Sequence, residues 1–195
     1  RQRVIDRFQR RPQGGAYADY AIWGEEVAGV ANIYPYTGQP GEVDVYVESS
    51  TEVDGIPTQA QIDAVFESIE LDNAGLASRR PANAYVYVLP IRRTRFDIAI
   101  TGLVGSDLAT LQADLLSAVE GYFSQAEPFI VGLSNPPSRD RLTDVSLSGV
   151  VNDIVSAAGG TFTSASFNRT GVPQRLVTYA LGEGEKARAY NVGFG

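Results

Sequence analysis

Cysteine, histidine and methionine are all absent from this sequence of 195 residues. Their absence excludes disulfide bonds, Cys or His nucleophile and base pairs, Ser-His-Asp triads and Cys/His zinc sites by residue type alone. No apolar run approaches the roughly 18 residues that span a bilayer, so we expect no membrane partner. These absences exclude more classes of function than any motif in the sequence supports.

Lysine is almost absent as well, since Lys186 is the only lysine of the sequence. The sequence has fifteen arginines, five of them within residues 1–11. The formal net charge of -7 disfavours an open phosphate-binding surface. Arginine is the better interface cation, because its guanidinium group is planar, weakly hydrated and able to stack. The chain begins with Arg1 instead of Met, so we expect it to be part of a longer protein.

The composition is that of a globular protein, with 44% hydrophobic and 20% charged residues. In the first half, the spacing of apolar residues predicts the order helix, strand, strand, helix, strand. The observations behind it are a stripe of Tyr17, Tyr20, Trp23 and Val27 ended at Gly29, a strand at 30–36, the alternating Val43, Val45 and Val47, a helix with the capping box Thr58/Gln61 and the stripe Ile62, Val65, Phe66 and Ile69, and a strand at 84–90.

The second half repeats this mixture of helices and strands. Its predicted elements are a strand at 96–103, a helix capped by Ser106 with the stripe Leu108, Leu111, Leu115, Val119 and Tyr122, a helix at 147–158, strands at 161–167 and 175–181, and a tail from Gly182 that is either loop or edge strand. We therefore predict an α+β fold with two small modules, residues 1–90 and 91–195, each with an antiparallel or mixed sheet packed by helices.

Two weak signals for chemistry occur on this framework. Gly182 to Ala187 matches the dinucleotide pattern G-x-G-x-x-A, but only eight residues follow it, too few for the required helix and crossover. Glu42, Asp44 and Glu48 share one face of a predicted strand, as calcium ligands or catalytic carboxylates can. The simpler interpretation is the solvent face of a strand whose valines are buried. We therefore predict no catalytic residue, no cofactor-binding residue and no metal ligand.

A stronger pattern is the pair Tyr85 and Tyr87, which share a sheet face and are flanked by five arginines, namely Arg79, Arg80, Arg92, Arg93 and Arg95. Some RNA-binding domains stack bases on sheet aromatics bordered by arginine. The acidic total favours packing of these tyrosines in a core or an interface instead. A single-stranded nucleic-acid-binding module remains the alternative function, and a carboxylate-dependent hydrolase is a third candidate.

Trp23 raises a separate question, because Asp19, Glu25 and Glu26 surround it in the sequence and such acids could complete a platform for a sugar or a cation. On a helix, however, Trp23 shares a face with Tyr20, while the acids point elsewhere. We interpret this stripe as scaffold that docks onto a sheet.

The stretch from Gly14 to Val47, GGAYADYAIWGEEVAGVANIYPYTGQPGEVDVYV, resembles the J-like baseplate proteins of contractile-tailed phages and related injection particles. The resemblance is carried by Gly14, Gly15, Asp19, Tyr20, Trp23, Gly29, Val30, Pro35, Gly41, Val43, Val45 and Val47. Gly24 departs from it, since the family usually has Ala there. The helix sequence DGIPTQAQIDAVFESI and the strand FDIAITGL extend the similarity toward the family's C-terminal domain.

The resemblance implies a structural role and not an enzyme. The expected function is that of a wedge subunit of the tail baseplate of a phage, prophage or injection particle, which links hub and sheath by protein-protein assembly. The expected partners are other wedge and hub proteins, with possible self-association in the assembled ring and with no nucleic acid and no small-molecule substrate. The implied location is the virion, after assembly in the cytoplasm of the bacterial host.

Overall fold

A computed structural model describes residues 15–72, 74–75, 79–133 and 139–195. The chain divides into two compact units. The first comprises Arg1–Arg92 and Ile130–Pro136, of which the described parts are residues 15–72, 74–75, 79–92 and 130–133. The second comprises Arg93–Phe129 and Pro137–Gly195. Both units combine helices with small sheets, which confirms the predicted α+β class.

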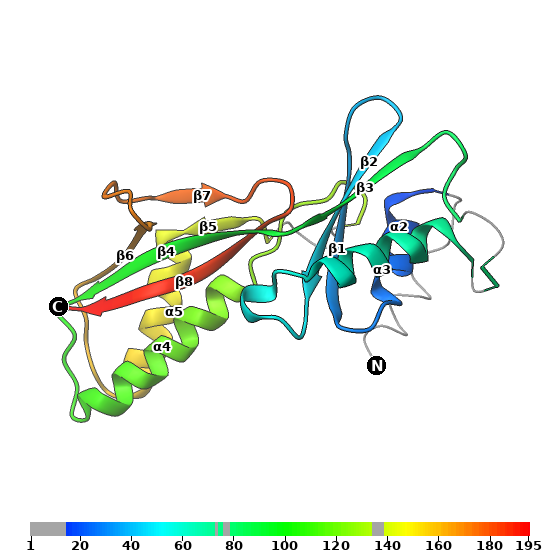
Figure 1. The fold of residues 1–195 in the computed structure, drawn as a ribbon. Coiled ribbons are helices and arrows are strands. Elements are labelled where there is room, and N and C mark those ends of the chain that lie inside the picture. The colour runs from blue at the N-terminus through cyan, green and yellow to red at the C-terminus, as the bar shows by residue number, and fades with distance from the viewer. Residues whose placement is uncertain (1–14, 73, 76–78, 134–138) are drawn as a thin grey trace. The chain divides into compact units, whose positions relative to one another are not determined.

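The first unit is a mixed sheet of three strands in the order β1-β2-β3 (Figure 1). Its elements are α2 (Tyr17–Glu25), β1 (Val30–Thr37), β2 (Glu42–Ser49), a 3-10 turn (Val53–Gly55), α3 (Gln59–Glu70) and β3 (Tyr85–Pro90). Strands β1 and β2 pair antiparallel through a tight turn. Strands β2 and β3 pair parallel, so the chain between them must cross over, and α3 forms that crossover.

The valine side of this sheet forms the first core. Val45 and Val47 on β2 are fully buried, as their alternation with polar residues predicts. Tyr20 and Ala21 of α2 pack into the same cluster, together with Val65 and Ile69 of α3. Both helices therefore cover one face of the sheet and leave the other face to different neighbours.

The ends of the helices follow local sequence signals. The Thr58 hydroxyl accepts a hydrogen bond from the amide of Gln61, whose side chain accepts one from the Thr58 amide in return, which confirms the capping box. Helix α2 ends at Glu25 and not at the predicted Gly29, so Val27 lies beyond its end. Gly29 does adopt the predicted left-handed conformation, with φ +82°. The prediction that Phe66 lies on the buried stripe of α3 is wrong. It is 43% exposed, because the core stripe is narrower than the spacing suggested.

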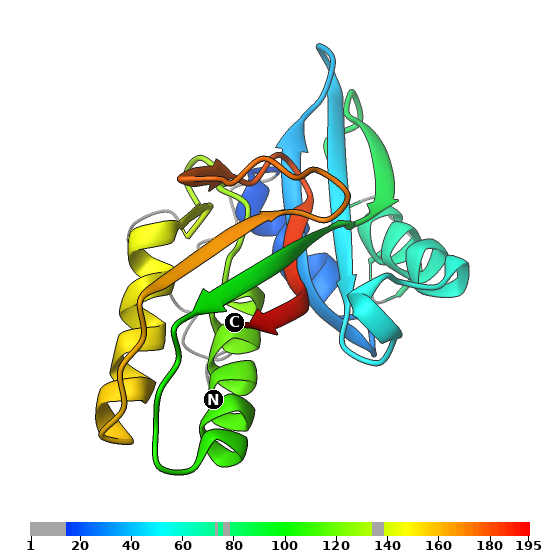
Figure 2. The same ribbon diagram turned by 90° about the vertical axis from the view of Figure 1, so that its left-hand side faces the viewer.

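The second unit has a three-stranded sheet in the order β6-β4-β8 and a two-stranded sheet of β5 and β7. Its elements are β4 (Arg92–Thr101), α4 (Leu108–Ser124), β5 (Arg141–Thr143), α5 (Asp144–Ala157), β6 (Ser164–Arg169), β7 (Thr178–Ala180) and β8 (Glu185–Phe194). Strand β6 pairs antiparallel with β4, whereas β8 runs in the same direction as β4 in Figure 1. Helices α4 and α5 lie side by side, as Figure 2 shows.

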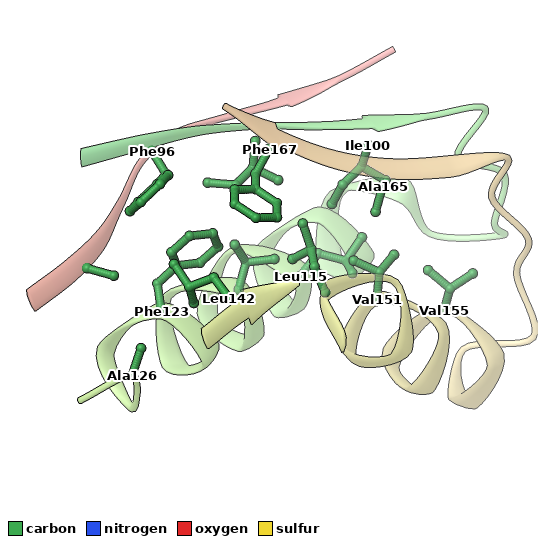
Figure 3. Packing of buried hydrophobic residues seen from close by; sticks show 14 of the residues in the cluster. Phe96, Ile100, Leu115, Phe123, Ala126, Leu142, Val151, Val155, Ala165 and Phe167 are labelled. Atoms are coloured by element: carbon green, nitrogen blue, oxygen red, sulfur yellow. The ribbon is translucent and has the colours of Figure 1, made fainter. Parts of the chain in front are cut away.

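Phenylalanines form the centre of the second core. Phe96 of β4 contacts Phe123 of α4 and Phe167 of β6, with ring centroids 5.4 and 5.8 Å apart, and Phe123 lies 5.9 Å from Phe167. Figure 3 shows Phe96 and Phe167 pointing from the strands toward Phe123 on the helix. Three rings from three elements therefore join the sheet to α4.

Helix α4 begins one residue later than the sequence suggested. Its N-cap is Asp107 and not Ser106, because the Asp107 carboxylate accepts hydrogen bonds from the hydroxyl and the amide of Thr110. The hydrogen bond from the Thr110 hydroxyl is the main reason why the pKa of Asp107 lies below its usual value, and the bond from the Thr110 backbone amide adds to the effect. Ser and Asp are both good N-cap residues, so composition alone did not separate them.

The tail from Gly182 is an edge strand, the second of the two predicted alternatives. Lys186 on β8 is only 3% exposed, and its ammonium group donates to the carbonyl oxygen of Ser124, the last residue of α4. A cation at that position also favours the negative end of the helix dipole. The buried lysine therefore ties the tail to the end of α4.

Among the helices that the structure describes, none is both long enough and apolar enough to cross a membrane.

Replacement of Phe123 by Ala is expected to lower the free energy of unfolding of the second unit by about 3 to 5 kcal/mol, because it leaves a cavity beside the rings of Phe96 and Phe167. Leu116→Ala is the matched control on the same helix, since Leu116 is 44% exposed, and it should cost less than about 1 kcal/mol. Chemical denaturation followed by circular dichroism measures both changes. Equal midpoints for the two variants would contradict the assigned core.

Candidate interaction surface

Trp23 is part of the scaffold of the first unit. Its half-buried ring packs edge-on against Tyr20, with centroids 5.4 Å apart, at the margin of the valine core. The Trp23 carbonyl accepts a hydrogen bond from the Ser68 hydroxyl, which ties α2 to α3. The neighbouring acids are used elsewhere, because Asp19 closes the start of α2 and Glu26 pairs with Arg79 at 2.8 Å. This geometry supports scaffold packing over a ligand platform.

Tyr85 and Tyr87 lie on the other side of the sheet from the valines. Tyr85 is 69% exposed and Tyr87 is 48% exposed, while Val86 between them is buried. The prediction that this pair packs in the core of the chain is therefore wrong, and packing in an interface with another protein stays a prediction. The pair forms an exposed aromatic step along β3, which is the end strand of its sheet.

Carboxylates border these two rings. The parallel register places Glu42 opposite Tyr85 and Asp44 opposite Tyr87. The Tyr87 hydroxyl donates to a Glu42 carboxylate oxygen at 3.4 Å. The negative charge of Glu42 is the main reason why the pKa of Tyr87 is raised above its ordinary value. We call these four residues, Glu42, Asp44, Tyr85 and Tyr87, the acid-tyrosine patch.

The flanking arginines do not complete a phosphate-binding surface on this patch. Arg79 and Arg80 form ion pairs with Glu26 and Glu70. The guanidinium group of Arg92 lies 5.9 Å from the centroid of the Tyr46 ring. The other two arginines belong to the second unit, where Arg93 donates to the Ala187 carbonyl and Arg95 lies over Tyr190 at 4.9 Å.

The rest of the tyrosine side of the sheet is covered by the chain itself. Tyr34 and Tyr36 of β1 form a separate buried cluster with Ile91 and Ile130. Tyr46 of β2 joins its margin and packs edge-on against Tyr36 at 5.9 Å. The sheet face is therefore closed toward Tyr34 and open at the acid-tyrosine patch.

Glu48 corrects the expectation that all three acids of β2 face solvent. It is buried, and its carboxylate accepts hydrogen bonds from the Asn32 amide at 3.0 Å and the Tyr34 hydroxyl at 2.8 Å. Register explains the difference, because Asn32 on β1 lies opposite Glu48. The polar Asn32 and Tyr34 within a mostly apolar strand were the available signal for this cluster.

The remaining candidate sites are taken up by local structure. In the G-x-G-x-x-A stretch, the Glu185 carboxylate accepts from the Gly182 amide at 2.7 Å and the Tyr179 hydroxyl at 2.6 Å, and a strand begins where a dinucleotide site would need a helix. Within the described ranges, no group of three or more Asp or Glu residues is placed to hold a metal ion. One small open cavity of about 210 Å³ lies beside the end of α4, bordered by Tyr122 and Arg141.

The geometry defines a two-unit α+β protein whose first unit has a mixed sheet with one face under helices and an acidic aromatic strip on the other. Comparison with known proteins finds a family model that matches part of this chain. Residues 12–90 match the model of the Baseplate J-like central domain. Residues 12–90 of this chain therefore resemble the central domain of baseplate J-like proteins.

Two individual matches agree with this assignment. The chain is 31% identical over 126 residues to the putative protein JayE of Escherichia coli (strain K12), a match that covers 63% of this chain and 46% of JayE. Its fold is similar to a chain in the cryo-EM structure of the anti-feeding prophage (AFP) baseplate, 6-fold symmetrised, with a TM-score of 0.59 and 9% sequence identity. That similarity covers 96% of this chain and 40% of the other, so the chain spans less than half the length of both matches.

Replacement of Glu42 by Gln is expected to lower the pKa of Tyr87 toward its ordinary value, because the substitution removes the negative charge that opposes formation of the phenolate. NMR titration of the tyrosine ring carbons above pH 9 measures the shift. Glu67→Gln on α3 is the control, since it makes the same charge change on the helix-covered side and should leave Tyr87 unaffected. An unchanged Tyr87 titration in Glu42→Gln would contradict the register of β2 and β3.

Proposed function

We propose that this chain is a structural subunit of a tail baseplate, belonging to a phage, a prophage or a related injection particle. The observation that carries the proposal is the J-like central domain at residues 12–90. The fold similarity over 96% of the chain to a chain of the AFP baseplate adds support for the arrangement of the elements. In this proposal residues 1–90 form the central module and residues 91–195 the C-terminal module.

The finer role we propose is that of a wedge subunit, which connects hub and sheath through contacts with other wedge and hub proteins. Assembly into a virion takes place in the cytoplasm of the bacterial host. The residue content supports a role without catalysis, because the nucleophile and base pairs that use Cys or His are absent from the sequence. The arginine-rich, lysine-poor set of cations supports function through protein interfaces.

The assembly role predicts that the isolated chain sediments mainly as a monomer or a weak dimer, because a subunit of a large complex divides its contacts among several partners. Coexpression with wedge, hub and sheath proteins of the same particle should yield a larger complex of defined mass. Analytical ultracentrifugation and mass photometry measure both states. A chain that stays monomeric in that mixture while turning over a small substrate would show that the protein is an enzyme.

The nucleic-acid alternative makes a separate prediction. Carboxylates beside Tyr85 and Tyr87 repel phosphates, so labelled single-stranded DNA and RNA should give flat anisotropy titrations even at low salt. The wild-type chain is the test protein, and Tyr85→Ala is its control. A saturable rise in anisotropy that Tyr85→Ala abolishes would establish the nucleic-acid-binding alternative.

A further inference from the structure

Arginine over tyrosine is a contact that this chain uses repeatedly. Within the described residues, guanidinium groups lie over the rings of Tyr46, Tyr179 and Tyr190, at 5.9, 6.0 and 4.9 Å from the ring centroids. Such a contact is an electrostatic attraction between a cation and the negative face of the ring. Arg rather than Lys suits it, because the planar guanidinium group also stacks.

The contact at Tyr179 has three components. The ring lies under the guanidinium group of Arg169, and the Tyr179 hydroxyl donates to the Glu185 carboxylate at 2.6 Å. The carboxylate adds negative potential next to the ring, so it strengthens the attraction for a cation. Tyrosine, carboxylate and arginine thus form one internal unit within a single chain.

The acid-tyrosine patch contains the first two components of this unit without the third. The Tyr87 hydroxyl donates to Glu42, and Asp44 stands directly opposite Tyr87. Among the residues that the structure describes, no guanidinium group lies over Tyr85 or Tyr87, and neither Glu42 nor Asp44 forms an ion pair. The open position is therefore on the solvent side of the two rings, where a second protein can reach it.

We propose that the acid-tyrosine patch binds an arginine-bearing segment of a different subunit of the assembly, with guanidinium groups over Tyr85 and Tyr87 and in contact with Glu42 and Asp44. The proposal rests on the proposed assembly function. A second copy of this chain is the poorer partner, because two molecules of net charge -7 repel each other. The same negative charge attracts a basic partner and raises the rate at which it associates.

Side-chain spacing indicates the form of the partner segment. Tyr85 and Tyr87 are two residues apart on a strand, a separation of roughly 7 Å. An extended segment with arginines at alternate positions has the same repeat. It can therefore place successive guanidinium groups over successive rings, whereas a helix presents residues of one face at positions three and four apart.

The test uses the full chain and a probe peptide, Arg-Ser-Arg-Ser-Arg blocked at both ends, with its all-lysine counterpart. NMR titration should show binding of the arginine peptide with shifts centred on Tyr85 and Tyr87, and binding of the lysine peptide weaker by about fivefold, because lysine lacks the stacking contribution. Tyr87→Ala and the double variant Glu42→Gln/Asp44→Asn should each weaken the binding of the arginine peptide by about fivefold or more. Tyr87→Phe, which keeps the ring, should lose less affinity for the arginine peptide than Tyr87→Ala.

The matched control is Asp63→Asn/Glu67→Gln on α3, with the same change of charge on the helix-covered side of the sheet. It should bind the arginine peptide as the wild type does. Equal affinity for both peptides, or equal affinity of the patch and control variants, would overturn the proposal, as would a dimer of the wild-type chain that Tyr87→Ala dissociates. If the coexpressed complex forms equally well with Tyr87→Ala, this inference alone is overturned. If the wild-type chain forms no complex on coexpression, the proposed function is overturned.

Discussion

The parallel pairing of β2 with β3 is the constraint on which the first unit depends. It cannot be closed by a tight turn, so it requires a crossover, and α3 supplies one that covers the valine face. The same register sets Glu42 and Asp44 beside Tyr85 and Tyr87 on the opposite face. One pairing thus determines both the packing of the core and the charge of the exposed strip. A slip of one residue would exchange these two faces.

The periodic parts of this fold were predictable from the sequence, because they depend on neighbours close in the chain. This group includes the alternation of Val43, Val45 and Val47, the capping box of α3 and the left-handed conformation of Gly29. The predicted α+β class follows from the same patterns. The J-like resemblance is also visible in the sequence, because its residues are concentrated in one stretch of the chain.

What could not be predicted depends on contacts between residues that are distant in the sequence. Glu48 is buried because Asn32 and Tyr34 reach it from the neighbouring strand. Arginines next to Tyr85 and Tyr87 in the sequence suggested a basic surface, whereas cross-strand pairing made it acidic. The tail strand β8 was uncertain for the same reason, since its glycine-rich start carries little strand propensity and its position depends on pairing with β4.

The burial of Lys186 has a practical consequence for mapping this protein in an assembly. Amine-reactive cross-linkers need an accessible primary amine, and the only lysine side chain of this sequence is enclosed at the end of α4. Cross-linking mass spectrometry based on lysine would therefore report few restraints for these 195 residues. Carbodiimide coupling through the exposed carboxylates, or reagents directed at arginine, would sample its surface instead.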